Sequence, residues 1–320
     1  MEQDKILITG AVGFIGFHLS KSLLDDGYQV LGLDNINNYY DINLKNDRLN
    51  LLNKYSDFKF EKIDISDKQA LSKSFLNFSP NKVVNLAAQA GVRYSIDNPY
   101  VYIESNIKGF LNIIELCRHN DIDGLIYASS SSVYGSNPKF PFSVKDKTDN
   151  PISLYAATKK TNELIANCYS ELYDLHTTGL RFFTVYGPWG RPDMAYFKFC
   201  KNIHDGKIIN IHNHGKMKRD FTYIDDIILG TRAAIDKNYK NKIFNLGNSK
   251  TKNLMDLVNL IENNLNKKAK IKMDSMQLGD VKETFASIES SKKLLGFSPN
   301  TSLNDGIALF VNWFKEYYKD

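Results

Sequence analysis

The chain has 320 residues, 42% of them hydrophobic, which is enough for one large domain or two closely packed ones with a substantial core. Its 41 Lys and Arg against 36 Asp and Glu leave a net charge of +5, which argues against nucleic-acid binding and remains compatible with an anionic small-molecule substrate. Three distant cysteines without C-x-x-C spacing, and no apolar run near the ~20 residues that span a bilayer, favour a cytoplasmic protein without disulfides, zinc or a membrane partner.

Apolar, strand-like runs alternate with helix-like segments through the first half of the chain. The runs cover 6–9, 30–34, 58–64, 83–87, 125–129 and 178–183, and a further one follows at 242–246. This alternation predicts an α/β fold with a doubly wound parallel sheet, covered by helices on both faces.

The second half is less regular. Between 186 and 217 the sequence is a loop rich in Gly, Pro, Trp and His, with one amphipathic helix near Phe197. We then expect a helix over 254–265, a lysine-rich turn, a loop through Gly279 and Asp280, and a last helix near 303–313. These segments predict a smaller C-terminal lobe that is interleaved with the first, with a cleft between the two.

Glycines mark the turn between the first strand and the following helix. Gly10, Gly13 and Gly16 are spaced G-x-x-G-x-x-G, with Phe14 and Ile15 between the last two. Without a Cβ atom, glycine lets the main chain approach a pyrophosphate, and the helix N-terminus then presents N–H groups to the phosphates. The spacing differs from the usual G-x-G-x-x-G pattern, so the glycines need support from elsewhere.

Asp34, at the end of the second strand, supplies that support. A carboxylate at this place accepts hydrogen bonds from both hydroxyls of an adenosine ribose and repels a 2′-phosphate, which favours NAD over NADP. Asp64 ends the third strand in a similar way. Two interpretations of Asp64 stay open, a contact to the adenine amino group or an N-cap of the next helix.

Tyr155 and Lys159 are four residues apart on an expected helix, so their side chains leave the same face and can act as a coupled acid/base pair. A phenol with a pKa of about 10 needs a drop of about three units to act as a base near neutrality. A nearby ammonium group and a nicotinamide cation are able to supply it.

Together with segments 85–90 and 129–135, these motifs give the chain a resemblance to the extended short-chain dehydrogenase/reductase family over essentially its whole length. Within that family it is most similar to the nucleotide-sugar 4-epimerases that act on UDP-glucuronate. The segments that carry this resemblance are 34–49, 90–95, 181–194 and 218–226.

The resemblance implies an NAD-dependent 4-epimerase of a UDP-sugar, most similar to those that convert UDP-glucuronate to UDP-galacturonate. Tyr155 would remove the proton from O4, and the hydride would return to the opposite face of a 4-keto sugar. Ser130 would complete the catalytic set with Tyr155 and Lys159, with Ser129 and Ser131 as weaker candidates for the same role. Because there is no net redox change, the NAD is expected to stay bound between turnovers.

The resemblance also implies contacts to both ligands. The expected NAD-binding residues are Gly10, Gly13, Phe14, Ile15, Gly16, Asp34, Asn35, Asp64, Ile65, Ala87, Ala88, Gln89, Asn106, Tyr155, Lys159 and Phe182. Asn106 is expected either to be structural or to contact a ribose. The expected substrate-binding residues are Arg93, Ser131, Ser132, Thr184, Arg191, Arg219 and Asp280. Ser132 and Thr184 would touch the uronate carboxylate, Arg191 would lie beside the pyranose, and Arg219 and Asp280 would hold the diphosphate and ribose.

By this resemblance, the domains are expected to be an NAD-binding Rossmann domain over 1–185 plus about 220–248, and a sugar-nucleotide lobe over 186–219 and 249–320. The apolar stripes of the helices around 106–117 and 154–173 fit a homodimer with an intersubunit four-helix bundle, although packing within one chain leaves the same pattern.

Alternative functions remain. A UDP-glucose or UDP-N-acetylglucosamine 4-epimerase is one, although galactose-type epimerases usually carry Asn where Thr184 stands. Dehydratases and decarboxylases commonly have an acidic residue in place of Ser132. A non-catalytic NAD sensor would usually have lost Tyr155 or Lys159. His212 and His214 are expected to be exposed polar residues and not metal ligands.

Overall fold

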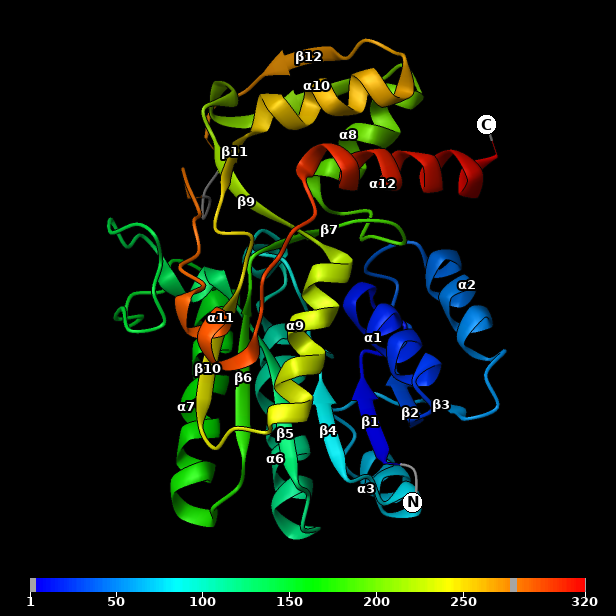
Figure 1. The fold of residues 1–320 in the computed structure, drawn as a ribbon, viewed down its shortest axis with the longest axis vertical. Coiled ribbons are helices and arrows are strands. Elements are labelled where there is room, and N and C mark those ends of the chain that lie inside the picture. The colour runs from blue at the N-terminus through cyan, green and yellow to red at the C-terminus, as the bar shows by residue number, and fades with distance from the viewer. Residues whose placement is uncertain (1–3, 277–280, 320) are drawn as a thin grey trace.

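The computed structural model describes residues 4–276 and 281–319. Its centre is a seven-stranded parallel sheet with the order β10-β6-β5-β4-β1-β2-β3 (Figure 1). The strands are β1 (Lys5–Thr9), β2 (Gln29–Asp34), β3 (Phe58–Lys62), β4 (Lys82–Asn85), β5 (Gly124–Ser130), β6 (Thr177–Phe182) and β10 (Lys242–Leu246). The doubly wound Rossmann fold expected from the sequence is confirmed. Its strand order reverses between β1 and β4, which is where ligands bind in such sheets.

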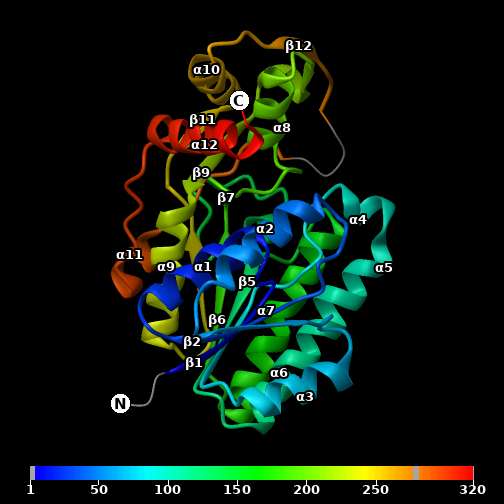
Figure 2. The same ribbon diagram turned by 90° about the vertical axis from the view of Figure 1, so that its right-hand side faces the viewer.

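Helices cover both faces of this sheet (Figure 2). On one side lie α1 (Phe14–Asp25), α2 (Ile42–Leu52), α9 (Ile224–Lys237) and α11 (Glu289–Leu295), and on the other α3 (Lys68–Phe78), α6 (Gly109–His119) and α7 (Leu154–Tyr173). Alternate residues of one strand supply the two cores. In β1, Ile6 and Ile8 pack into the core that contains α1, while Leu7 packs into the core that contains α6. Burial on both faces explains why the strands read as nearly continuous apolar runs.

A smaller group of elements lies beyond the carboxyl ends of the strands, at the top of Figure 1. It holds α8 (Ala195–His204), α10 (Leu254–Leu265) and α12 (Leu303–Tyr318), and two small sheets. One sheet has the order β11 (Thr251–Asn253), β9 (Lys218–Tyr223), β7 (Thr184–Tyr186), and the other pairs β12 (Lys270–Met273) with β8 (Ile208–Ile211). Short helical segments, α4 (Tyr94–Asp97), α5 (Pro99–Tyr102), Ile103–Lys108, Ser131–Tyr134 and His212–Gly215, complete the chain.

The pairing of β8 with β12 was not expected from the sequence. A loop was expected at β8 and a lysine-rich turn at β12, whereas the two strands form a parallel pair in which Ile209 lies opposite Ile271. Each strand has only four residues, and every side chain of β12 is exposed. β12 has no buried face and therefore no apolar periodicity, and β8 buries only Ile209 and Ile211, so the pair is revealed only by the contact between the two strands.

Two features bear on partners and metals. Within residues 4–276 and 281–319, no helix is both long and apolar enough to cross a membrane. The same residues contain no group of three or more His, Cys, Asp or Glu side chains arranged to hold a metal ion.

Candidate active site

A cavity of about 800 Å³ lies at the carboxyl ends of the central strands and reaches the smaller group of elements above them. The residues that follow β1, β2, β4 and β6 all line it, among them Gly10, Asn35, Ala87 and Phe183. The loops at this edge of a doubly wound sheet lie on either side of the point where the strand order reverses. The fold therefore collects residues from many parts of the chain at one site.

The glycines of the turn after β1 allow main-chain atoms to come close to one another. Gly10 has φ +70°, and a Cβ atom there would lie 2.8 Å from the Ala87 nitrogen. Gly16 is tighter still, because its Cβ atom would lie 2.0 Å from the Gly10 oxygen and would push α1 off the turn. Gly13 precedes α1 and no side chain caps the first turn of the helix. The first N–H groups of α1 are therefore left for a ligand at the cavity wall.

Two carboxylates stand beyond the next strands. Asp34 is only 9% exposed, and burial raises its pKa while the hydrogen bond from the Ile36 N–H opposes the rise. Asp64 lies past the end of β3 and accepts hydrogen bonds from Asn35 Nδ2 (2.8 Å) and from the N–H of Ser66 (2.9 Å). Burial acts to raise the pKa of Asp64, but these hydrogen bonds outweigh it and the pKa is lowered.

The structure rules out one of the two interpretations of Asp64, and the contact to adenine stays a prediction. The N-cap of α3 is Asp67, whose side chain accepts hydrogen bonds from the N–H groups of Gln69 and Ala70, both at 3.1 Å. The interpretation of Asp64 as a helix cap is therefore wrong. Asp64 lines the cavity together with Asn35 and Ile65.

Asn106 does not line the cavity; it holds the cavity wall in place. It is 1% exposed, its Oδ1 accepts the Gln89 N–H at 2.8 Å, and its Nδ2 donates to the Gln89 oxygen and to Thr158 Oγ1, both at 3.0 Å. These bonds fix the loop that contains Ala87, Ala88 and Gln89 against α7. Of its two expected roles, the structural one fits this geometry.

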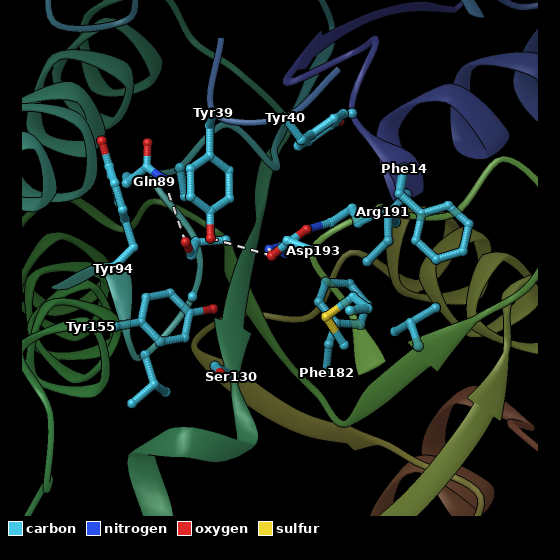
Figure 3. A pocket seen from close by; sticks show the side chains of 18 of the residues that line it. Phe14, Tyr39, Tyr40, Gln89, Tyr94, Ser130, Tyr155, Phe182, Arg191 and Asp193 are labelled. Atoms are coloured by element: carbon cyan, nitrogen blue, oxygen red, sulfur yellow. Dashed lines mark hydrogen bonds and ion pairs between the residues drawn. The ribbon is translucent and has the colours of Figure 1, made fainter. Parts of the chain in front are cut away.

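Tyr155 and Lys159 both line the cavity from the N-terminal part of α7, where Ser153 caps the helix. In Figure 3 the Tyr155 hydroxyl points into the cavity, with Ser130 close to it. Lys159 Nζ donates to the Ala128 oxygen at 2.8 Å, and no hydrogen bond among the described residues joins it to Tyr155. Burial lowers the pKa of Lys159 to about 8. Burial also raises the pKa of Tyr155, against the Ser130 hydroxyl and the charge of Arg191, so any phenolate depends on further positive charge.

The neighbouring serines have different partners. Ser129 donates to Glu163 Oε1 at 2.6 Å, and Glu163 forms two 2.8 Å hydrogen bonds with Arg181, both side chains being almost fully buried. The Ser129 hydroxyl is thus hydrogen-bonded to the buried ion pair between α7 and β6. Ser130 Oγ accepts the Ser132 N–H at 3.1 Å and lies 3.1 Å from the Ser132 hydroxyl, and both residues line the cavity.

Six of the seven residues expected to contact the substrate line the same cavity. Arg93, Ser131, Ser132, Thr184, Arg191 and Arg219 all line it. Asp280 lies outside the described residues. Arg219 donates to the main-chain oxygens of Lys218 (2.9 Å) and Lys282 (3.2 Å).

Residues 6–247 match the model of the NAD dependent epimerase/dehydratase family. The chain belongs to this family. Protein CapI of Staphylococcus aureus is 51% identical, over 98% of this chain and 99% of that protein. UDP-glucuronate 4-epimerase 4 of Arabidopsis thaliana is 50% identical, over 98% of this chain and 76% of that protein. The crystal structure of UDP-glucuronic acid 4-epimerase from Bacillus cereus with UDP-glucuronic acid and NAD is similar with a TM-score of 0.93 and 35% identity, covering 98% of this chain and 100% of that chain.

In this epimerase/dehydratase chain, an ion pair inside the cavity was not foreseen. Arg191 Nε and Nη2 lie 3.0 and 2.6 Å from the two carboxylate oxygens of Asp193, and the Tyr39 hydroxyl donates to Asp193 at 3.2 Å. Burial acts to lower the pKa of Arg191, but Asp193 outweighs it and the pKa is raised. Tyr39 and Asp193 stand in the segments that carry the family resemblance, yet no spacing rule connects residues so far apart in sequence.

His212 differs from the expectation that both histidines of this loop are exposed. Although its neighbour His214 is exposed, His212 is partly buried and lines the cavity together with Asn210 and Met217. Its Nδ1 is buried without a hydrogen-bond partner among the described residues. The glycine-bearing loop suggested exposure for both histidines, but the β8–β12 pairing places the start of the loop against the cavity.

Proposed function

We propose that this protein is an NAD-dependent UDP-sugar 4-epimerase that converts UDP-glucuronate to UDP-galacturonate. One observation carries the proposal. The cavity that the glycine turn and Asp34 open into also holds Tyr155 with Ser130 and a set of neutral hydroxyl donors, Ser132 and Thr184. The likeness to proteins named UDP-glucuronate 4-epimerase supports this choice of substrate.

The residues of the cavity fit NAD. The uncapped N-terminus of α1 and the close approach at Gly10 suit a pyrophosphate, and the buried Asp34 carboxylate suits the hydroxyls of a ribose. Lys159 would hold the nicotinamide ribose, and Phe182 and Ala88 would line the rings. A bound NAD would supply the acceptor for the hydride from carbon four of the sugar and, as NADH, the donor that returns it to the opposite face.

Tyr155 would take the proton from O4 while Ser130 holds that oxygen. Since burial works against a phenolate, Tyr155 needs positive charge nearby. Lys159 is a source of it, because a pKa of about 8 still leaves its amine largely protonated at neutral pH. Arg191 adds a second positive charge that acts on Tyr155 from the substrate side.

A uronate adds a hazard, because a ketone at carbon four turns it into a β-keto acid that readily loses carbon dioxide. We infer that Ser132 and Thr184 hold the carboxylate in an orientation that disfavours cleavage of the C–C bond, with Arg191 beside the pyranose and Arg219 on the diphosphate. Release of labelled carbon dioxide at a rate comparable to epimerisation would contradict this inference.

The decisive experiment is to incubate the purified protein with UDP-glucuronate, without added NAD, and to follow the anomeric and carbon-four protons by NMR. Formation of UDP-galacturonate is the expected result, and it would also show that NAD copurifies. Turnover of UDP-glucose or UDP-N-acetylglucosamine instead, with UDP-glucuronate inert even after NAD is added, would move the assignment to those substrates. No turnover of any of the three would favour a non-catalytic role.

We also propose a homodimer formed through α6 and α7, which lie side by side in both views (Figures 1 and 2). Large apolar side chains are exposed on this face, including Leu111 (42%), Leu164 (55%) and Leu172 (70%). Large apolar side chains exposed on two neighbouring helices are typical of a surface that a partner covers. The division into two lobes with the cavity between them, and a cytoplasmic location, stay predictions.

A further inference from the structure

Residues 34–41, which we call the strap, leave β2 and pass along the cavity wall. The side chains of Asp34, Asn35 and Asn37 each accept a hydrogen bond from the main-chain N–H two residues further on, at 2.8, 3.1 and 3.3 Å. Lys45 Nζ then donates to both oxygens of Asn37, at 2.7 and 2.8 Å. The strap is therefore a preformed arc, anchored at the carboxylate that we assign to the ribose of NAD.

Tyr39 is the tip of this arc. Its hydroxyl donates to Asp193 Oδ2 at 3.2 Å, and its ring centroid lies 4.9 Å from that of Tyr94. Gly91, at φ +101°, makes room for it, because a Cβ atom there would lie 2.7 Å from the Tyr39 hydroxyl. In Figure 3, Tyr39 reaches into the cavity between Tyr155 and the Arg191–Asp193 pair. The tip thus joins the strap to the loop between β7 and α8.

The same loop is also joined to α2, the helix that follows the strap, and this helix holds the strap itself through Arg48 Nη1, which donates to the Tyr40 hydroxyl at 2.8 Å. Arg48 on α2 is fully buried and donates to the oxygens of Trp189 (2.5 Å) and Gly190 (3.0 Å). Separating α2 from this loop would leave the buried Arg48 guanidinium without these two hydrogen-bond acceptors, which is costly. The tip is different, because Asp193 is 20% exposed and Tyr39 is half-buried, and opening it breaks only the contacts of Tyr39 with Asp193, Arg191 and the ring of Tyr94. The strap therefore has a fixed base and a tip that is able to open.

We propose that Tyr39 and Asp193 form a latch that closes the strap over bound NAD and sets how slowly NAD leaves. The proposal rests on the proposed function, because it takes NAD to be the ligand of this cavity. An epimerase that takes its hydride back in every turnover gains from a cofactor that remains in place. Tyr39 is on this view a positioning residue, and the latch acts on NAD exchange, not on the chemical step.

The charges at the tip keep the latch closed over a wide pH range. Burial, together with the charge of Asp193, raises the pKa of Tyr39 to about 12, so its hydroxyl remains a donor. Burial acts to raise the pKa of Asp193 as well, but Arg191 outweighs it and the pKa is lowered, so the carboxylate remains an acceptor. The latch is therefore a hydrogen bond to an ionised acceptor, which is the stronger kind.

Tyr39→Phe tests the latch, because it removes the hydroxyl and keeps the ring contact with Tyr94. The protein as purified, with its NAD, is mixed with excess alcohol dehydrogenase and ethanol, and the appearance of NADH reports NAD release. Loss of one hydrogen bond to a charged acceptor is expected to speed release roughly tenfold or more. Tyr100→Phe is the matched control, since Tyr100 is 83% exposed and lies outside the cavity lining, and it should release NAD at the wild-type rate.

Each outcome decides something. Faster release from Tyr39→Phe alone, with an unchanged melting temperature in excess NAD, supports the latch. Equal release from wild type and both variants overturns it, and so does a melting temperature several degrees lower, which would make the hydroxyl a structural element. A wild-type protein that carries no NAD and binds none would instead refute the cofactor assignment of the proposed function, so the two failures are distinguishable.

Discussion

Replacing Lys159 by methionine should stabilise the NAD-free protein at neutral pH while it removes activity. Lys159 is 3% exposed, and burial lowers its pKa from the ordinary 10.5 to about 8. At about 1.4 kcal/mol per pKa unit, this shift means that the buried ammonium group lowers the free energy of unfolding by roughly 3 kcal/mol near pH 7. Methionine has a similar length and no charge, but it loses the hydrogen bond to Ala128, worth about 1 kcal/mol. We therefore expect a net stabilisation of about 2 kcal/mol.

The sign of the pH dependence follows from the same shift. The folded chain releases the Lys159 proton near pH 8, whereas the unfolded chain keeps it until about pH 10.4. Between these values the unfolded chain binds more protons, so the free energy of unfolding of the wild type rises with pH relative to that of Lys159→Met. The advantage of the variant should therefore be largest below about pH 8 and should be gone by about pH 10.5.

Urea denaturation of NAD-stripped wild type and Lys159→Met at a series of pH values measures this difference. Other titrating groups act equally on both proteins and cancel. A difference that does not change with pH, or a variant less stable than wild type at neutral pH, would refute burial as the cause of the low pKa of Lys159. Retention of full activity by the variant would refute its role in the reaction.

Three further predictions concern other parts of the molecule. Tyr155→Phe should slow epimerisation at least about 1000-fold in the NMR assay, with unchanged NAD content after purification, because only the proton-transfer group is lost. Glu163→Gln should lower the free energy of unfolding by about 3–5 kcal/mol in urea, since it leaves Arg181 buried without its carboxylate; a loss below about 1 kcal/mol would contradict this. Leu172→Glu should shift the mass measured by light scattering from dimer to monomer, whereas Leu229→Glu, equally exposed on α9, should not; a wild-type monomer would refute the dimer.

Parts of the site were readable from the sequence because they depend on neighbours in the chain. Tyr155 and Lys159 share a helix, so their spacing alone places both on one side of α7, and both line the cavity. The glycines of the first turn are needed by a strand-to-helix connection that the apolar pattern already predicts. Asp34 ends a buried strand, and every parallel strand of such a sheet ends at the same edge.

Other parts depended on contacts that spacing does not encode. Three adjacent serines look alike in the sequence, and only the buried Glu163–Arg181 pair shows that the Ser129 hydroxyl is committed elsewhere. Asn106 was expected either to be structural or to contact a ribose, and only its hydrogen bonds show that it holds the Gln89 main chain to α7. Both outcomes follow from hydrogen bonds between elements that are brought together by packing.

The doubly wound sheet, the edge where ligands bind and the residue types at this edge could all be predicted from the chain, because strand and helix periodicity and turn glycines are local properties of the chain. Which of those side chains face the cavity, the contact of Tyr39 with Asp193 and the pairing of β8 with β12 could be seen only in the folded molecule. These contacts join residues that are far apart in the chain. Their geometry is set by the packing of helices and loops around the sheet, which no single segment of the sequence encodes.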